Sequence, residues 1–211
     1  IVAPGIYDAY GARMVEQAGF EAAYMTGNGV SASVLGRPDV GLVDLTLLSR
    51  HAHYAAACID IPLICDADTG YGNAVNVRHT VREFEAAGVA AIHIEDQATP
   101  KRCGHLPGAR PVIELSEAVG KIESAVAARR DPDFVIIART DSATGQGIDA
   151  AIKRVQAFHQ AGADVLFVEL KTSSTILEDM KRVTESADAA FLVNIDGGGR
   201  LGELTASEIE R

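Results

Sequence analysis

Two carboxylates separated by one residue close an apolar run of the sequence. In the run Pro62–Asp68, Asp66 and Asp68 alternate with Cys65 and Ala67, so in a strand both aspartates lie on one face. Neighbouring carboxylates repel each other unless a cation lies between them, and hard oxygen ligands select Mg²⁺ or Mn²⁺. The pair indicates a divalent metal site, with capping of the following helix as the structural alternative.

Polar residues also end the other apolar runs. They are His93 with Glu95, Arg139 with Asp141, Glu169, and Asn194 with Asp196. We expect Asp66, Asp68 and Glu95 to hold the metal. Arg139 is then left to clamp a substrate carboxylate in a bidentate fork, which balances the charge of the site.

A third chemical feature is the segment Lys101-Arg102-Cys103-Gly104-His105. Two cations and an imidazole beside a thiol stabilise its thiolate, so Cys103 is a candidate acid, base or nucleophile. Cys58 and Cys65 lie in apolar patterns and are expected to pack in the core. Three cysteines without C-x-x-C spacing favour neither a disulfide framework nor a tetrahedral zinc site, which suggests a reducing, cytoplasmic compartment.

These residues must be positioned by alternating strands and helices. The expected strands are Ala22–Gly27, Pro62–Asp68, Ala90–Asp96, Phe134–Thr140, Val165–Leu170 and Phe191–Ile195. The expected helices are Ile6–Ala18, Leu45–Cys58, Asn76–Ala87, Leu115–Arg129, Ile148–Ala161 and Ser174–Glu185. Gly19, Gly88 and Gly162 close three of these helices just before a strand. This alternation is typical of an α/β fold with a parallel sheet.

Polar residues at the carboxyl ends of nearly every strand favour a (β/α)8 TIM barrel over an open sheet, because a barrel builds its site from those ends. We expect residues 1–211 to form a single (β/α) barrel domain with about six βα units. The domain would be C-terminally incomplete, lacking strands seven and eight, since the sequence stops inside an expected helix from Thr205 onward.

The composition excludes several classes of partner. The net charge is −10 without a block of consecutive basic residues, which argues against nucleic acid. Apolar runs such as 89–92 are far too short to cross a bilayer, and no leader pattern precedes Pro4, so we expect no membrane association.

Lys101-Arg102-Cys103-Gly104-His105-Leu106 resembles the K-[KR]-C-G-H signature of the isocitrate lyase and phosphoenolpyruvate mutase superfamily. Further segments in that family's order are Tyr24-Met25-Thr26-Gly27, Gly36-x-Pro38-Asp39-x-Gly41, Asp66 to Gly72, Ile94 to Gln97, and Ile137 to Asp141. The resemblance covers almost the whole chain, and the ordered set is far more specific than any single segment.

The resemblance implies an Mg²⁺-dependent barrel enzyme, with Mn²⁺ as a possible substitute, that reacts through an enolate or aci-carboxylate. Cys103 favours the lyase branch, which cleaves a C–C bond of a 2-hydroxy di- or tricarboxylate to pyruvate or a similar 2-oxo acid plus a carboxylate. The shorter members are 2-methylisocitrate lyase, 2,3-dimethylmalate lyase and oxaloacetate hydrolase. The alternatives are oxaloacetate hydrolysis, phosphonate chemistry on the same enolate platform, and a catalytically silent barrel.

The resemblance also implies roles for individual residues. Cys103 would protonate the departing fragment and Tyr24 would remove the C2 hydroxyl proton, while Asp39 would contact a metal-bound water. The implied catalytic residues are Cys103, Tyr24, Arg139 and His105, and the implied substrate-binding residues are Thr26, Gly27, Lys101, Arg102, Gly104, Arg139, Glu169 and Asn194. The substrate would be a small carboxylate, and the protein a cytoplasmic homotetramer that exchanges a C-terminal helix.

Overall fold

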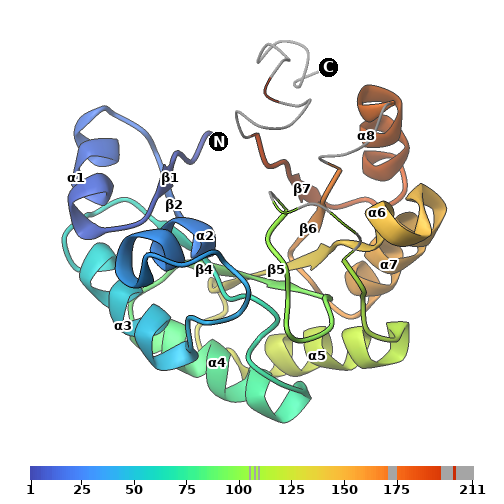
Figure 1. The fold of residues 1–211 in the computed structure, drawn as a ribbon, viewed down its shortest axis with the longest axis horizontal. Helices are drawn as coiled ribbons and strands as arrows, with labels where there is room; N and C mark the ends of the chain where they lie inside the picture. Colours follow the sequence, from blue (N-terminus) through green and yellow to red (C-terminus); the bar gives the residue numbers. More distant parts are fainter. Residues whose placement is uncertain (105, 107, 109, 171–174, 196–201, 203–211) are drawn as a thin grey trace.

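A computed structural model describes residues 1–104, 106, 108, 110–170, 175–195 and 202. Its centre is one seven-stranded sheet in which every strand pairs in parallel with the next strand along the chain. The strands are β1 (Gly5–Ile6), β2 (Ala23–Met25), β3 (Leu63–Asp66), β4 (Ala91–Glu95), β5 (Val135–Thr140), β6 (Val165–Val168) and β7 (Ala190–Leu192). The sheet curls into part of a barrel, with β1 and β7 toward its two ends (Figure 1).

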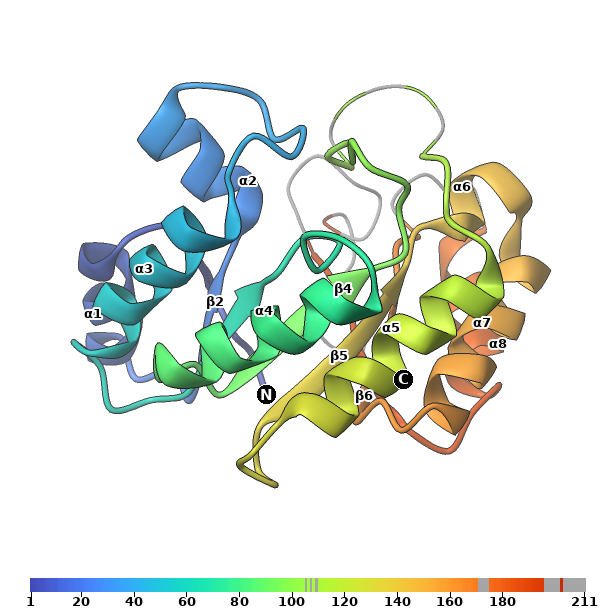
Figure 2. The same cartoon turned by 90° about the horizontal axis from the view of Figure 1, so that it is seen from below.

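Helices cover the outer side of this sheet as an arc (Figure 1). The arc consists of α1 (Ala9–Gln17), α3 (Leu45–Ala56), α4 (Ala74–Ala86), α5 (Leu115–Ala128), α7 (Ile148–Gln160) and α8 (Ile176–Thr184). The shorter elements are α2 (Gly27–Val30), the π-helical turn η1 (Ser31–Leu35) and α6 (Ser142–Gln146). Figure 2 shows α2, the loop that follows β4 and α6 gathered along one edge of the sheet. This edge holds the carboxyl ends of the strands.

Local sequence explains where the main helices begin. Asp8 and Asp44 accept hydrogen bonds from the backbone of the first turns of α1 and α3. Asn73 and Asn76 form a reciprocal capping box at the start of α4. All five residues of β4 are buried, as expected for a central parallel strand covered on both faces.

The predicted α/β barrel architecture is confirmed as a curled parallel sheet with helices outside. The predicted number of strands is wrong by one, because the six expected strands are β2 to β7 and a further strand, β1, precedes them. Ile6, expected to start a helix, belongs to β1, and α1 begins only at Ala9. A two-residue strand carries too little pattern to be recognised from sequence. The additional strand thus lies at the N-terminal end of the sheet, before the first expected strand.

Two further differences concern the ends of elements. Gly27, expected to end a strand, begins α2, and α4 starts at Ala74 rather than Asn76. The expected helix from Thr205 lies outside the described residues. Within the described part of the chain, none of the helices combines the length and the apolar character needed to cross a membrane.

Candidate active site

The register of the sheet places chemically active residues beside each other. Asp66 at the end of β3 is paired with His93 of β4, and Glu95 of β4 is paired with Arg139 of β5. Each of these side chains is buried. The predicted site therefore lies at the carboxyl ends of β3, β4 and β5, where loops from neighbouring units converge.

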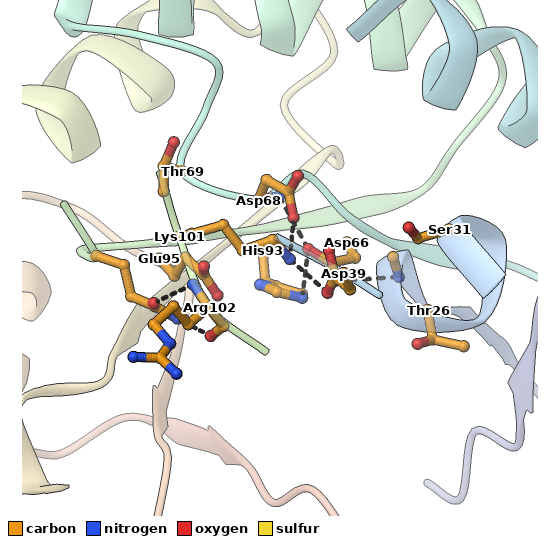
Figure 3. Close-up of polar contacts among 12 residues, drawn as sticks. Thr26, Ser31, Asp39, Asp66, Asp68, Thr69, His93, Glu95, Lys101 and Arg102 are labelled. Atoms are coloured by element: carbon orange, nitrogen blue, oxygen red, sulfur yellow. Dashed lines mark hydrogen bonds and ion pairs between the residues drawn. The ribbon is translucent and has the colours of Figure 1, made fainter. Parts of the chain in front are cut away.

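One half of the site is a cluster of acidic side chains around a lysine. The ammonium group of Lys101 lies 2.6 Å from Oδ2 of Asp39 and 2.5 Å from Oδ1 of Asp68. Lys101 is only 4% exposed, so this charge is shielded from solvent. Figure 3 shows the Lys101 side chain among Asp39, Asp66 and Asp68, with the guanidinium of Arg102 pointing away from them.

Asp66 is held in place by three groups. Its Oδ1 lies 3.2 Å from Nε2 of His93 and accepts the backbone N–H of Asp68 at 2.8 Å. Its Oδ2 accepts the backbone N–H of Gly27 at 3.1 Å. Asp68 itself has a φ of 49°, a left-handed conformation that aspartate tolerates better than most residues. The backbone strain thus falls in the middle of the acidic cluster.

The charges of this cluster shift its pKa values. Burial raises the pKa of Asp66, but His93, Lys101 and Arg139 lower it by more, so the carboxyl stays ionised. Burial raises the pKa of Asp68 to about 7, with support from Asp66 and Asp39, although Lys101 opposes the shift. Burial lowers the pKa of Lys101, but the carboxylates around it raise it by more, so the ammonium keeps its charge.

The other half of the site is built around Arg139. Its Nε and Nη2 donate to the two carboxylate oxygens of Asp141 at 2.9 Å each, and Glu95 and Glu169 each lie 3.4 Å away. Nε of Arg110 lies 3.1 Å from Oδ1 of Asp141. Burial raises the pKa of Glu95 well above its usual range, although Arg139 opposes this. A cation bound nearby would lower this pKa and allow the carboxyl to ionise, so Glu95 is suited to contact a further cation.

An aromatic row forms the floor below both halves. The ring of Tyr24 stacks on that of His93 at 5.8 Å, and His93 meets Phe167 edge to face at 5.9 Å. Arg139 lies over the Phe167 ring at 4.9 Å. These residues come from β2, β4, β6 and β5. Burial and the Asp66 carboxylate raise the pKa of Tyr24 well above its usual range, so the phenol keeps its proton at neutral pH here, and its predicted role as a base requires a further positive charge nearby to lower that pKa.

A buried hydrogen-bonded network supports the site from the helix side. Asp96 accepts the Thr140 hydroxyl at 2.6 Å, the Asp141 backbone N–H at 3.0 Å and an Arg154 N–H at 3.1 Å. Arg154 also donates to the carbonyl oxygen of Ile113 at 2.8 Å. The network fixes Asp141, which in turn holds Arg139.

The residues present fit a divalent cation that keeps part of its water. In the described part of the chain, no three His, Cys, Asp or Glu side chains lie close enough to ligate one ion together. However, six carboxylates there face three cations, and Oε1 of Glu95 is buried without a hydrogen-bond partner among the described atoms. Mg²⁺ dehydrates reluctantly and is usually bound by one or two carboxylates, with water completing its shell.

Several predicted residues meet in this site. Asp66, Asp68, Glu95, Asp39, Arg139, Lys101 and Glu169 are buried there. Gly27 belongs there too, because a Cβ at this position would lie 2.7 Å from Oδ2 of Asp66. The backbone N–H of Cys103 donates to the carbonyl oxygen of Asp39 at 3.1 Å. A Cβ on Gly104 would lie 2.8 Å from Arg110 and 3.7 Å from Glu169, so this loop closes over the Arg139 half.

Other predicted residues differ from expectation. Lys101, expected to bind substrate, pairs with Asp39 and Asp68 because buried carboxylates need a nearby cation. The fork of Arg139, expected to be left for substrate, holds Asp141, which points the same way two residues along the chain. Thr26 caps α2, where its hydroxyl accepts the Gly29 N–H at 3.3 Å.

One further predicted residue is exposed, and another is not described. Asn194 is exposed after β7, and His105 lies outside the described residues. Sequence reasoning missed Arg110, Arg154 and Gln97. Arg154 had a recognisable signal, since it lies beside Val155 and between Ala151 and Phe158 on the buried face of α7.

The fold and the site define a class, a parallel (β/α) barrel enzyme with an acidic, arginine-lined site at the strand ends. All 211 residues match the family described as phosphoenolpyruvate phosphomutase. The chain belongs to this family, within the phosphoenolpyruvate mutase/isocitrate lyase superfamily of enzymes.

Two of the similar curated relatives are named as lyases. The 2,3-dimethylmalate lyase of Eubacterium barkeri is 49% identical over 210 residues, which is 100% of this chain and 71% of the relative. The 2-methylisocitrate lyase of Aeropyrum pernix is 42% identical over 99% of this chain and 65% of the relative. The chain thus spans about two thirds of the length of these enzymes.

Solved structures are similar along the whole chain. An oxaloacetate acetylhydrolase in complex with the inhibitor 3,3-difluorooxalacetate superposes with a TM-score of 0.92 at 38% identity, covering 100% of this chain and 71% of that one. A 2,3-dimethylmalate lyase superposes with a TM-score of 0.90 at 40% identity, covering 100% and 70%.

Proposed function

We propose that this chain carries the site of an Mg²⁺-dependent carbon–carbon lyase. Its substrate would be a 2-hydroxy di- or tricarboxylate of the substituted malate or methylisocitrate type, cleaved to pyruvate or a similar 2-oxo acid plus a carboxylate. Similarity to 2,3-dimethylmalate lyase and 2-methylisocitrate lyase supports the reaction class.

One observation carries the proposal. The segment with Cys103 is attached to the acidic cluster, because Lys101 bridges Asp39 and Asp68 while the Cys103 N–H donates to the Asp39 carbonyl oxygen. A thiol two residues from a buried lysine in a carboxylate cluster is suited to deliver a proton beside a metal.

Asp66 and Asp68 would hold the metal, and Glu95 would contact it through water. Bound there, a divalent cation stabilises negative charge that develops on the substrate's oxygens. Asp39 and Lys101 keep Asp68 oriented, and Gly27 and His93 keep Asp66 oriented.

The bond that breaks joins C2 to C3 of the substrate. The C2 hydroxyl would give its proton to the predicted base Tyr24, in its phenolate form, and become the carbonyl of the 2-oxo acid, while the bonding electron pair leaves with C3 as an aci-carboxylate. The Cys103 thiol then gives its proton to C3. Arg139 and Arg110 lie beside Asp141, Glu95 and Glu169. Once a divalent cation offsets the excess of carboxylates, these guanidinium groups would attract the anionic substrate.

Oxaloacetate hydrolysis is the second candidate. The observation that favours it is the TM-score of 0.92 with an oxaloacetate acetylhydrolase. That reaction breaks a C–C bond with water as the co-reactant, so it would use the same carboxylate cluster.

The test is a substrate panel. The protein with Mg²⁺ is offered 2,3-dimethylmalate, 2-methylisocitrate, oxaloacetate and phosphonopyruvate, and pyruvate, oxalate and phosphate are followed. Pyruvate from one of the first two substrates, lost in Cys103→Ser, supports the lyase. Oxalate from oxaloacetate supports the hydrolase instead, and phosphate release or no turnover contradicts both.

A further inference from the structure

A buried glutamine stands where the loop that carries Cys103 leaves the sheet. Gln97 is the second residue after β4 and is only 1% exposed. A buried amide costs stability unless its donor and acceptor are both satisfied. The partners of this side chain therefore indicate why it is there.

Both polar atoms of the Gln97 amide form hydrogen bonds with the backbone of one loop residue, Arg102. Nε2 of Gln97 donates to the carbonyl oxygen of Arg102 at 3.1 Å, and Oε1 accepts the Arg102 backbone N–H at 2.9 Å. The side chain thus imitates a neighbouring peptide group, as in a strand pair. It fixes the orientation of the peptide bonds on both sides of Arg102, including the one that leads into Cys103.

The backbone of Gln97 is itself fixed. Gln97 forms an antiparallel bridge with Val112, and the Ala98 N–H donates to the Pro111 carbonyl oxygen at 2.8 Å. The Ile113 N–H donates to the Asp96 carbonyl oxygen at 2.9 Å. These contacts join the two ends of the loop, so Gln97 projects from a rigid base.

Three consecutive loop residues are consequently held in place by Asp39, Asp68 and Gln97. The Lys101 side chain binds the two aspartates, the Arg102 backbone binds Gln97, and the Cys103 N–H binds the Asp39 carbonyl oxygen. Gln97 therefore holds Arg102, which lies between Lys101 and Cys103 in the sequence. Figure 3 shows Lys101 and Arg102. Without it, the peptide that sets the direction of Cys103 has no side-chain support from the end of β4.

We propose that Gln97 is a positioning residue that orients the Cys103 backbone, and with it the thiol, toward the reacting carbon; this rests on the proposed function for the role of the thiol. Gln97 touches neither substrate nor metal in this role. This role requires a side chain that carries a hydrogen-bond donor and a hydrogen-bond acceptor next to each other, because it pairs with both the C=O and the N–H of Arg102. Glutamate would place a second oxygen against the Arg102 carbonyl, and alanine would remove both hydrogen bonds between Gln97 and the Arg102 backbone.

The experiment combines thiol reactivity with steady-state kinetics. Gln97→Glu, which is nearly isosteric, and Gln97→Ala are compared with the wild type and with Gln156→Glu. Gln156 is an exposed glutamine of α7 whose amide donates to the Ser186 carbonyl oxygen, so its variant is the matched control. Alkylation by iodoacetamide is measured in EDTA by peptide mass spectrometry. The half-buried Cys58 serves as the internal reference.

We expect both Gln97 variants to change the ratio of Cys103 to Cys58 alkylation rates at least about fivefold and to lower kcat roughly ten- to hundredfold, with KM nearly unchanged. Gln156→Glu should change neither. An unchanged ratio in a folded Gln97→Glu variant overturns the proposal, as does a changed ratio with wild-type kcat. If the wild type has no lyase or hydrolase activity, the proposed function fails, whereas the alkylation ratio still tests whether Gln97 orients Cys103.

Discussion

The backbone N–H of Gly27 donates to the carboxylate of Asp66 across 3.1 Å, and a methyl group on Gly27 would lie 2.7 Å from the same oxygen. The first turn of α2 therefore rests directly on a candidate metal ligand. A side chain at position 27 would force one of the two to move.

Gly27→Ala should therefore weaken metal binding more than it weakens the fold. We expect a loss of about ten- to hundredfold in Mg²⁺ affinity, as seen when groups that orient a ligand are removed. Isothermal titration with Mg²⁺ measures the affinity, and circular dichroism checks the fold. Gly120→Ala is the control, because a Cβ on Gly120 in α5 meets nothing within 4 Å. Equal Mg²⁺ affinity in both variants would contradict the prediction.

Lys101→Met should destabilise the metal-free protein, because Asp39 and Asp68 would then be buried without their cation. Removing one partner of a buried ion pair costs about 3–5 kcal/mol. Urea unfolding in EDTA measures this change in the free energy of unfolding. The exposed Lys153→Met in α7 should change it little. If both lysine variants unfold at the same urea concentration, the buried pair does not stabilise the fold.

The raised pKa of Asp68 gives a pH dependence with a defined sign. The group has a folded pKa of about 7 against an ordinary value of 3.8, so between these values the folded state binds the additional proton. The free energy of unfolding in EDTA should then fall as the pH rises from about 4 to about 7, by on the order of a few kcal/mol. Asp68→Asn should flatten this slope. A slope that is the same in wild type and variant would refute the assignment.

Arg154 and Asp96 should be energetically coupled, because the guanidinium supplies one of the bonds that keep the buried Asp96 carboxylate in place. Arg154→Met alone leaves that carboxylate buried without its cation, and the loss should shrink when Asp96→Asn is also present. A double-mutant cycle on urea unfolding should give a coupling of roughly 0.5–3 kcal/mol. Strict additivity would show that the network is not cooperative.

Tyr71→Phe offers a prediction of the opposite sign. The Tyr71 hydroxyl is buried without a hydrogen-bond partner among the described residues. Removing an unsatisfied polar group should leave the stability of the metal-free protein equal or slightly higher, by up to about 1 kcal/mol. Thermal unfolding in EDTA tests this. A loss larger than that would mean that the hydroxyl has a partner in solution.

The strand ends could be predicted because their pattern is local. Continuous apolar runs that close on Asp66, Glu95 and Arg139 mark buried parallel strands, and alternation fixes which residues face the site. β1 was not predicted because its two residues, Gly5 and Ile6, contain only one apolar side chain and therefore show no strand pattern.

The direction of each loop could not be predicted in the same way. Lys101 and Arg102 are adjacent cations, and the sequence predicts substrate binding for both. In the structure Lys101 is buried among aspartates, whereas the guanidinium of Arg102 points away from them. That choice depends on where the loop of Asp39 folds, which lies far away in the sequence. The role of Gln97 was missed for the same reason, because it depends on where the loop brings the backbone of Arg102, whereas Arg154 was missed although its place on the buried face of α7 gave a signal.

The order of the sheet bears on how the chain reaches this structure. In the described part of the chain, each strand pairs with its neighbours along the sequence, so the partners of β2 to β6 are made directly before and after them. Glu16 and Glu85, at the ends of α1 and α4, each accept two consecutive backbone N–H groups from the turn before β3 and the turn before β5. Each emerging βα unit can dock on the one already folded, and local pairing of this kind shortens the search during synthesis on the ribosome.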